Sequence, residues 1–370
     1  MKLSSFTIIV TDDCNFDCKY CPQTKEKKFI DLETIKKAVD FFFPALIKGS
    51  SIGFYGGEPL LCFDTIKESV SYIEKKNFLE KEVSLSITTN GSLLNKEILE
   101  FLNRHRFSVK LSFDGLAHNI SRRKENFEKI VSKIKKIQKY SQIELEINSV
   151  FTPGTIGYLA ESIKFILELG VKDMRYVLST IEEWEKKDLR KFENELLKTV
   201  DIVVSTCKKS GSIIVSNFKI DPSKKGIFVC TAGKDRMAVT PEGKIWGCYQ
   251  FHDYFKGKEK IKEYSKYSFA DLGYFIEHFK TLYPEILPNY TELRMDNFSS
   301  GDSYCFLCGD IESCDVCPVY TAYSTSVIGK IPGWVCEINK IKSRGKKFFQ
   351  RKIQKNKKKG IRGQSRNDTF

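Results

Sequence analysis

Three cysteines near the start of the chain are spaced closely enough to share one metal centre. Cys14, Cys18 and Cys21 form a C-x3-C-x2-C pattern directly after an aliphatic run at residues 4–10. Each iron of a cubane iron–sulfur cluster takes one sulfur ligand, so three thiolates leave the fourth iron open. An open position separates catalytic metal sites from closed structural ones. The pattern favours a reactive iron–sulfur cluster over two alternatives, a zinc site completed by a distant histidine and three neighbouring reduced thiols.

A second set of seven cysteines lies in the C-terminal third. Cys230 is separated from Cys248 by a stretch that contains Gly243, and the rest crowd into the last part of the set. A zinc ribbon would use four cysteines and not seven. The later members of the set are Cys305, Cys308, Cys314, Cys317 and Cys336.

Short β-rich runs alternate with longer amphipathic segments up to about residue 180. The predicted strands are residues 4–10, 51–55, 83–89, 108–113, 143–151 and 174–178. The predicted helices are residues 31–47, 63–77, 95–104, 121–140, 155–169 and 182–208. Repeating strand–helix units predict a parallel sheet, and six strands are too few for a complete eight-stranded barrel. The expected fold is therefore α/β, a partial (β/α)6 barrel whose site lies at the carboxyl ends of the strands.

The chain divides by composition into three parts. Residues 1–210 would form the partial barrel, residues 211–338 a smaller cysteine-rich domain built around something other than an apolar core, and residues 339–370 a basic, flexible tail. The net charge of +14 belongs mostly to this tail, because residues 338–370 hold 13 of the 61 Lys and Arg but one of the 47 Asp and Glu. The charge is therefore no indication of nucleic-acid binding by the folded body.

The cysteine content also indicates the compartment. Twelve cysteines in 370 residues are too few for a disulfide scaffold, and no apolar run is long enough to span a membrane. We expect a cytoplasmic protein without a membrane segment. Cys62 and Cys207 are expected to be buried free thiols, Cys207 being a reserve ligand, and the four histidines show no metal-ligand spacing.

The first cysteine motif resembles that of the radical SAM superfamily. Tyr20 matches the aromatic residue before the third cysteine, and FYGGEP at residues 54–59 follows the second predicted strand. The resemblance implies that the open iron binds S-adenosylmethionine and that the reduced cluster cleaves it to a 5′-deoxyadenosyl radical, which removes hydrogen from a substrate. The residues implied to contact this cofactor are Tyr20, Gly56, Gly57, Glu58, Pro59, Thr89, Asn90, Ser112, Arg122 or Arg123, and Asn148.

The second cysteine set resembles the SPASM extension of these enzymes. By that resemblance Cys305, Cys308, Cys314 and Cys336 hold one auxiliary [4Fe–4S] cluster. Cys230, Cys248 and Cys317 hold a second auxiliary cluster with an open or exchangeable iron. The spacing before Cys317 is one residue shorter than usual in that family.

The resemblance also narrows the substrate. Most enzymes of this layout modify a peptide or protein, and two residues used in sulfatase maturation are replaced here by Gln23 and Tyr249. We therefore expect a thioether or carbon–carbon crosslink in a ribosomally made peptide, with formylglycine formation in sulfatases as the alternative. A flavodoxin- or ferredoxin-type protein would donate electrons. No leader-binding domain precedes Cys14, so a separate protein could recognise the leader.

The sequence leaves open which residues act as acid or base and whether the protein is an enzyme. Candidates for acid–base chemistry near the auxiliary cysteines are Asp235, Tyr249 and Asp253. An iron–sulfur electron-transfer protein with a basic tail for an acidic partner is the non-enzymatic alternative; it explains the cysteines but not FYGGEP.

Overall fold

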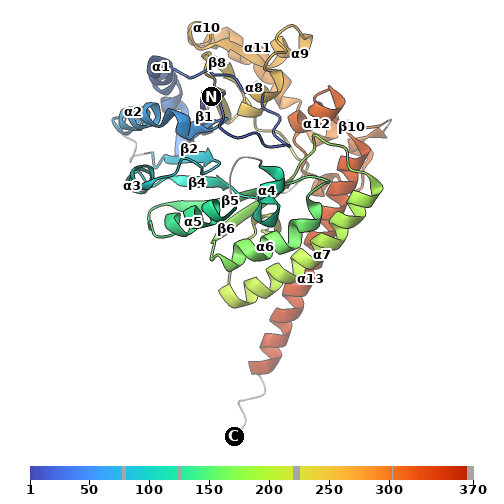
Figure 1. Ribbon diagram of the computed structural model, residues 1–370. Coiled ribbons are helices and arrows are strands. Elements are labelled where there is room, and N and C mark those ends of the chain that lie inside the picture. Colours follow the sequence, from blue (N-terminus) through green and yellow to red (C-terminus); the bar gives the residue numbers. More distant parts are fainter. Residues whose placement is uncertain (77–80, 123–126, 220–225, 302, 365–370) are drawn as a thin grey trace.

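The computed structural model describes residues 1–76, 81–122, 127–219, 226–301 and 303–364, with the backbone alone for 356–364. Its centre is one sheet in the order β6-β5-β4-β3-β2-β1-β7-β8-β9, in which β1 to β6 run parallel (Figure 1). The first six strands are β1 (Leu3–Thr11), β2 (Leu46–Gly56), β3 (Ser84–Thr89), β4 (Ser108–Ser112), β5 (Glu144–Phe151) and β6 (Asp173–Leu178). The six predicted strands and the open, partial barrel are confirmed.

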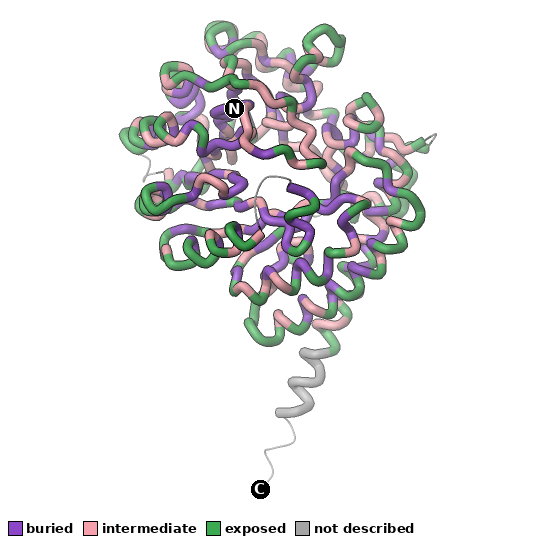
Figure 2. The backbone as a smooth tube through the Cα atoms, in the orientation of Figure 1, coloured by how far each residue is buried: buried purple, intermediate pink, exposed green. Residues whose placement is uncertain are grey.

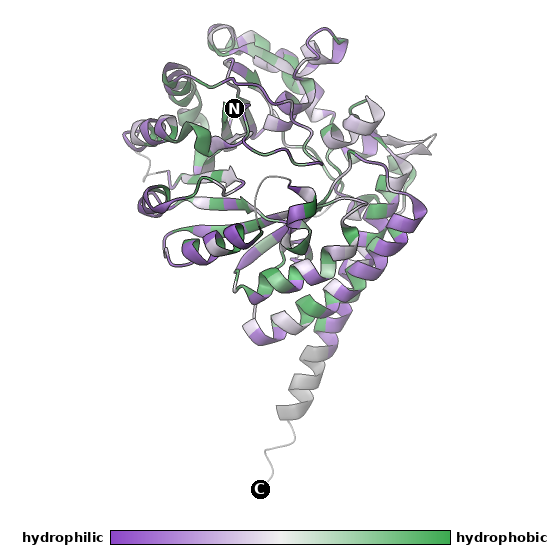
Figure 3. Ribbon diagram, in the orientation of Figure 1, coloured by the Kyte–Doolittle hydropathy of each residue, from purple (hydrophilic) through white to green (hydrophobic). Residues whose placement is uncertain are grey.

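Helices connect the parallel strands, as the sequence pattern predicts. They are α1 (Leu32–Phe42), α2 (Phe63–Glu74), α3 (Lys96–Arg104), α4 (His118–Ser121), α5 (Phe127–Ile137), α6 (Leu159–Glu168) and α7 (Lys186–Ser210). Asp31 caps α1 and Asn95 caps α3, each accepting a backbone N–H of the first turn. Figure 3 shows the hydrophilic side of α7 facing outward. The crossovers leave the carboxyl ends of the strands together at one edge.

The sheet continues into the C-terminal part of the chain, which the sequence had assigned to a separate domain. Strand β7 (Arg236–Val239) pairs in parallel with β1, and β8 (Lys244–Trp246) and β9 (Ser268–Asp271) extend the sheet in antiparallel orientation. This region also has an apolar core, contrary to expectation, because Trp246 stacks on Phe255 and Phe269 stacks on Tyr290, and this core is continuous with that of the barrel. The buried apolar surface comes from aromatic side chains in short elements, which a search for long amphipathic helices overlooks.

The remaining elements are short and surround the later cysteines. The helices are α8 (Tyr249–Phe255), α9 (Lys262–Tyr267), α10 (Leu272–Glu277), α11 (Phe279–Thr291) and α12 (Pro318–Thr325). A small sheet contains β10 (Ser299–Ser300), β11 (Ser303–Tyr304) and β12 (Lys330–Ile331). Short elements leave the cysteine loops to be fixed by local turns and by whatever the thiols bind.

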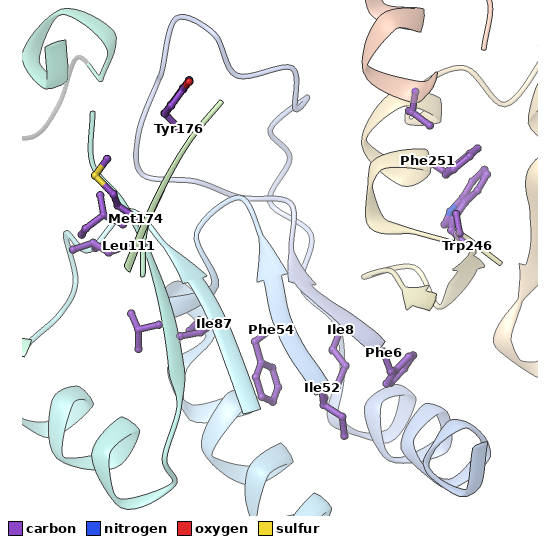
Figure 4. Packing of buried hydrophobic residues seen from close by; sticks show 14 of the residues in the cluster. Phe6, Ile8, Ile52, Phe54, Ile87, Leu111, Met174, Tyr176, Trp246 and Phe251 are labelled. Atoms are coloured by element: carbon purple, nitrogen blue, oxygen red, sulfur yellow. The ribbon is translucent and has the colours of Figure 1, made fainter. Parts of the chain in front are cut away.

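The buried residues follow the strands (Figure 2). Ile8, Ile52 and Phe54 are each at most 1% exposed and lie between the sheet and its helices, while Trp246 and Phe251 lie apart in the C-terminal core (Figure 4). No helix among the described residues is long and apolar enough to cross a bilayer.

The C-terminal segment differs from the flexible tail expected for residues 339–370. Helix α13 (Gly333–Gln364) runs beside α7 (Figure 1), and its Ile341 and Phe349 are almost fully buried. Phe349 lies 5.1 Å from the ring of Phe218, and Arg344 pairs with Glu193 of α7 at 2.7 Å. The many lysines predicted a flexible tail, but the apolar residues between them pack the helix against the rest of the protein.

This docking predicts a loss of stability on truncating Phe349. A buried phenylalanine changed to alanine costs about 3–5 kcal/mol, so Phe349→Ala should lower the thermal unfolding midpoint by several degrees. Exposed Lys347 of the same helix is the matched control, and Lys347→Ala should leave the midpoint unchanged. Equal midpoints for the two variants would show that α13 contributes nothing to the fold.

Candidate functional site

The loop after β1 brings the first three cysteines together. Burial raises the pKa of each thiol of Cys14, Cys18 and Cys21, and the thiols raise one another's pKa further. Mutual destabilisation of their charged forms shows that the sulfurs lie close to one another. A cationic group shared among the three would reverse this effect, because it stabilises the thiolate forms.

The chemistry of the donors fits an iron–sulfur cluster. Three thiolates from one loop are the set that a cubane cluster with one open iron takes. Among the residues that the structure describes, no three cysteine sulfurs all lie within 4.8 Å of one another.

The glycines of FYGGEP have a different immediate neighbour from the expected ligand. A Cβ on Gly56, whose φ is +148°, would lie 2.1 Å from the Thr11 carbonyl oxygen, and one on Gly57 would lie 2.2 Å from that of Asp13. The amide of Gly57 donates to the Thr11 carbonyl at 3.0 Å. Both glycines are required because the backbone of the cysteine loop packs directly on them.

Glu58 is oriented into the protein and not outward. Its carboxylate accepts hydrogen bonds from the Thr89 hydroxyl at 2.6 Å and from the backbone amides of Asn90 at 2.7 Å and Leu60 at 3.2 Å. Burial nevertheless raises the pKa of Glu58 to about 7. Three donors leave little acceptor capacity for a ligand, so the main contribution of Glu58 is to join the ends of β2 and β3.

The remaining candidate residues lie at or near the strand ends, as the sequence predicts, but they differ in whether a protein group hydrogen-bonds their side chains. Asn90 donates to Asn15 of the cysteine loop at 2.9 Å. Ser112, the last residue of β4, pairs in register with Asn148 inside β5, and within the described residues no protein group hydrogen-bonds their side chains. Pro59 begins the 3-10 turn Pro59–Cys62. Of this group, Ser112 and Asn148 have polar atoms available for a ligand.

Arg122 and Tyr20 take part in an internal network. The guanidinium of Arg122 pairs with Asp114 at 2.9 Å and lies 4.0 Å from the sulfur of Cys18. The Tyr20 hydroxyl donates to Asp114 at 2.9 Å. Arg123, the other candidate, falls outside the described residues.

The later cysteines separate into two groups in the structure. Burial raises the pKa of Cys248 and of Cys317 to about 12; Cys230 raises the pKa of Cys248 further, and Cys248 and Cys230 both raise that of Cys317. Cys248 immediately precedes α8 and Cys317 precedes α12, so two helix N-termini begin at this group. A helix N-terminus favours an anionic group.

The second group is nearer the surface. Cys305, Cys308 and Cys336 raise the pKa of Cys314, which burial raises to about 12. Cys336 lies in the first turn of α13 and donates to the Ser300 hydroxyl at 3.1 Å. Cys62 is buried beside the Val10 carbonyl, and Cys207, in α7, interacts with neither group.

A carboxylate and several tyrosines lie between the first cysteine loop and the inner auxiliary group. Asp253 accepts hydrogen bonds from the Gln23 amide at 3.1 Å and from the Tyr55 hydroxyl at 3.3 Å, and burial raises its pKa to about 6. The ring of Tyr249 lies 4.1 Å from that of Tyr55. Asp253 and Tyr249 are four residues apart on α8 and therefore share one face of it.

Both neighbouring cysteine groups are within electrostatic reach of this junction. Asp253 raises the pKa of Cys21 and of Cys248, and the Tyr323 hydroxyl, buried without a hydrogen-bond partner, interacts with Asp253, Cys21 and Cys317. Asp235, the third sequence candidate, immediately precedes β7; its carbonyl accepts the amides of Ser4 and Ser5, and, in addition to burial, its carboxylate raises the pKa of Cys230.

A buried ionic network was missed from the sequence. His252 hydrogen-bonds Asp12 at 2.9 Å, and Lys256 pairs with the same carboxylate at 2.7 Å, which joins α8 to the cysteine loop. Asp12, Glu242 and His252 also form a group with metal-ligand spacing, but lysines neutralise both carboxylates. Only the i, i+4 spacing of His252 and Lys256 hinted at this contact.

Comparison with known proteins agrees with this arrangement of strands and cysteines. Residues 8–170 match the model of the Radical SAM superfamily. An uncharacterized protein of Methanocaldococcus jannaschii, MJ0907, is 30% identical over 246 residues, which cover 65% of this chain and 82% of that protein. The radical SAM cyclopropyl synthase TigE of Paramaledivibacter caminithermalis is 24% identical over 72% of this chain, and the match spans 63% of TigE, less than two thirds of its length.

The fold extends the likeness beyond the matched segment. The structure of anSMEcpe with bound AdoMet and the Cp18Cys peptide superposes with a TM-score of 0.71 and 20% identity, covering 95% of this chain and 98% of that one. This likeness includes the C-terminal cysteine region as well as the parallel strands. The coverage of the archaeal relative, the family match and the cysteine loop at the end of β1 together show that the chain is an enzyme of the radical SAM superfamily.

Proposed function

We propose that the protein is a peptide-modifying radical SAM enzyme that forms a crosslink, thioether or carbon–carbon, in a ribosomally made peptide. The observation that carries this proposal is the placement of Asp253, Gln23 and Tyr55 between the first cysteine loop and the inner auxiliary cysteines. A substrate at this junction would lie within reach of both centres. An electron-transfer protein has no need of a buried acid with a raised pKa at that place.

Three sets of residues would hold the cofactors. Cys14, Cys18 and Cys21 would bind the cluster that carries S-adenosylmethionine, with Ser112 and Asn148 available to the cofactor's polar groups. When bound, these groups supply the radical that removes a hydrogen atom from an unactivated carbon. The backbone of Gly56 and Gly57 would act indirectly, by holding the cysteine loop in place.

Residues 211–338 would form the auxiliary-cluster region. Cys230, Cys248 and Cys317 would hold an inner cluster with one open iron, and the other group a cluster with four protein thiolates. The interactions among the thiols support this partition of the seven cysteines. The continuous sheet indicates that this region folds with the barrel and not as an independent domain.

The environment of Asp253 favours a reaction that releases a proton. Forming a thioether replaces one C–H and one S–H bond with a C–S bond; one hydrogen atom, one proton and one electron must leave. Asp253 is placed to accept the thiol proton, and Gln23 and Tyr55 orient its carboxylate by donating to it. The cluster and cofactor held by Cys14, Cys18 and Cys21 would supply the acceptor of the hydrogen atom, and a centre held by Cys230, Cys248 and Cys317 would supply the acceptor of the electron.

The substrate class is supported by the relatives and by two departures. TigE is named for cyclopropane formation and anSMEcpe was solved with a peptide, so relatives of this fold act on different groups. Gln23 and Tyr249 stand where sulfatase-type enzymes use a tyrosine and an aspartate, and here Gln23 contacts Asp253 instead. This different placement of the acidic residue, Asp253, supports crosslink formation over formylglycine formation.

The proposal is tested by incubating the anaerobic, cluster-loaded enzyme with dithionite, S-adenosylmethionine and cysteine-containing peptides encoded beside its gene. The expected result is 5′-deoxyadenosine together with a peptide that has lost two hydrogens and one free thiol. A peptide whose cysteine has become an aldehyde would establish formylglycine formation instead. Absence of 5′-deoxyadenosine would reject the enzymatic activity itself. A flavodoxin or ferredoxin is expected to replace dithionite.

A further inference from the structure

A buried ion pair lies directly against one of the three cysteines of the first loop. Arg122 and Asp114 are 5% and 0% exposed, and they form two hydrogen bonds, Nε to Oδ2 at 2.9 Å and Nη2 to Oδ1 at 3.2 Å. The third guanidinium nitrogen, Nη1, lies 4.0 Å from the sulfur of Cys18. The guanidinium therefore bridges a carboxylate and a thiol with all three nitrogens.

The backbone holds this arrangement in place as well. Cys18 and Arg122 form an antiparallel bridge, and the amide of Lys19 donates to the Ser121 carbonyl at 3.0 Å. Asp114 is fixed independently, because it also accepts the Tyr20 hydroxyl and the Val150 amide, both at 2.9 Å. Arg122 thus has no freedom to swing toward a cofactor at the strand ends.

Charges in such a position act strongly on a cluster that changes charge. Water screens exposed charges, whereas a buried guanidinium 4 Å from a ligand sulfur interacts through a medium of low dielectric constant. A positive charge stabilises the more negative, reduced form of the cluster, and a negative charge destabilises it. The potential of an iron–sulfur cluster responds to nearby charge and to hydrogen bonds on its sulfurs.

We propose that Arg122 and Asp114 form an electrostatic control on the cluster held by Cys18, with Arg122 as a positioning residue and not a contact of S-adenosylmethionine. The guanidinium favours the reduced cluster, and Asp114 limits this effect while anchoring Arg122 and Tyr20. This inference rests on the proposed ligand role of Cys14, Cys18 and Cys21.

The two partners are expected to shift the reduction potential in opposite directions. Arg122→Gln should make it more negative and Asp114→Asn more positive, and the double variant should fall between them. Arg122→Lys keeps the charge and should stay close to the wild type. Lys19→Gln removes an exposed cation next to Cys18 and should cause no shift. A purely structural role would instead move both single variants in the same direction or leave the potential unchanged.

The measurement is an EPR-monitored redox titration of the full-length, cluster-loaded enzyme without substrate. The signal of this cluster is identified as the one that a Cys14/Cys18/Cys21→Ala variant lacks. Shifts of one sign for both single variants, or no shift, would overturn the inference while leaving the enzyme's function intact. No difference between the wild type and the triple cysteine variant would overturn the proposed ligand set instead. If Arg122→Gln does not fold, Asp114→Asn, Arg122→Lys and the double variant still decide the sign.

Discussion

Replacing Cys14, Cys18 and Cys21 together with alanine is expected to abolish formation of 5′-deoxyadenosine. The three thiols lie in the loop that directly follows β1, close enough to raise one another's pKa. Without them no centre remains there to deliver an electron to S-adenosylmethionine, so the loss should be complete and not partial. The measurement is 5′-deoxyadenosine per enzyme after anaerobic incubation with dithionite.

The auxiliary cysteines provide the control for this result. In addition to burial, Cys308 and Cys336 raise the pKa of both Cys305 and Cys314, which places these four thiols in one group. The triple variant should therefore keep its remaining iron and the visible absorbance of its auxiliary clusters. A matched variant, Cys62→Ala, removes a buried thiol outside all three groups and should cleave S-adenosylmethionine at the wild-type rate. Retained 5′-deoxyadenosine in the triple variant would refute the assignment.

The parallel half of the fold was predictable because its signals are local. Each strand is a short β-rich run and each helix has an apolar stripe, so the ends of β3 and β5 were located within one or two residues. The docking of α13 was not predictable in this way. Its apolar residues are separated by lysines, and Phe218, which contacts Phe349, is distant in the sequence.

The site shows the same division between local and long-range information. The first cysteine group follows from its spacing in one short loop, whereas the partition of the later seven was implied by the resemblance to the SPASM extension. The contacts of Glu58 with Thr89 and Asn90 and of Gln23 with Asp253 join segments about 30 and 230 residues apart, and nothing in either segment specifies its partner. Polar residues near the strand ends were therefore predictable, while their protein partners were not: Glu58 accepts from Thr89 and Asn90, and Arg122 pairs with Asp114.

Asp253→Asn is expected to separate cleavage of S-adenosylmethionine from formation of the crosslinked peptide. Asparagine has nearly the same shape and can still accept hydrogen bonds from Gln23 and Tyr55, but it cannot accept a proton. Cleavage of S-adenosylmethionine should continue, while crosslinked peptide should fall by about 10²-fold or more, the usual contribution of a positioned base. The ratio of peptide product to 5′-deoxyadenosine measures this separation.

The pH dependence of product formation is a second, independent test of Asp253 as the base. Burial raises the pKa of Asp253 to about 6, and the base is active only when ionised. Product formation by the wild type should therefore rise with pH through about 6 and level off above it, and the Asn variant should lack this rise. Asp64→Asn is the matched control, since Asp64 is an exposed carboxylate of α2, and it should retain both the yield and the pH profile. An unchanged product ratio in Asp253→Asn would mean that the proton leaves by another route, with the buried, unpartnered hydroxyl of Tyr323 as the next group within reach of the same junction.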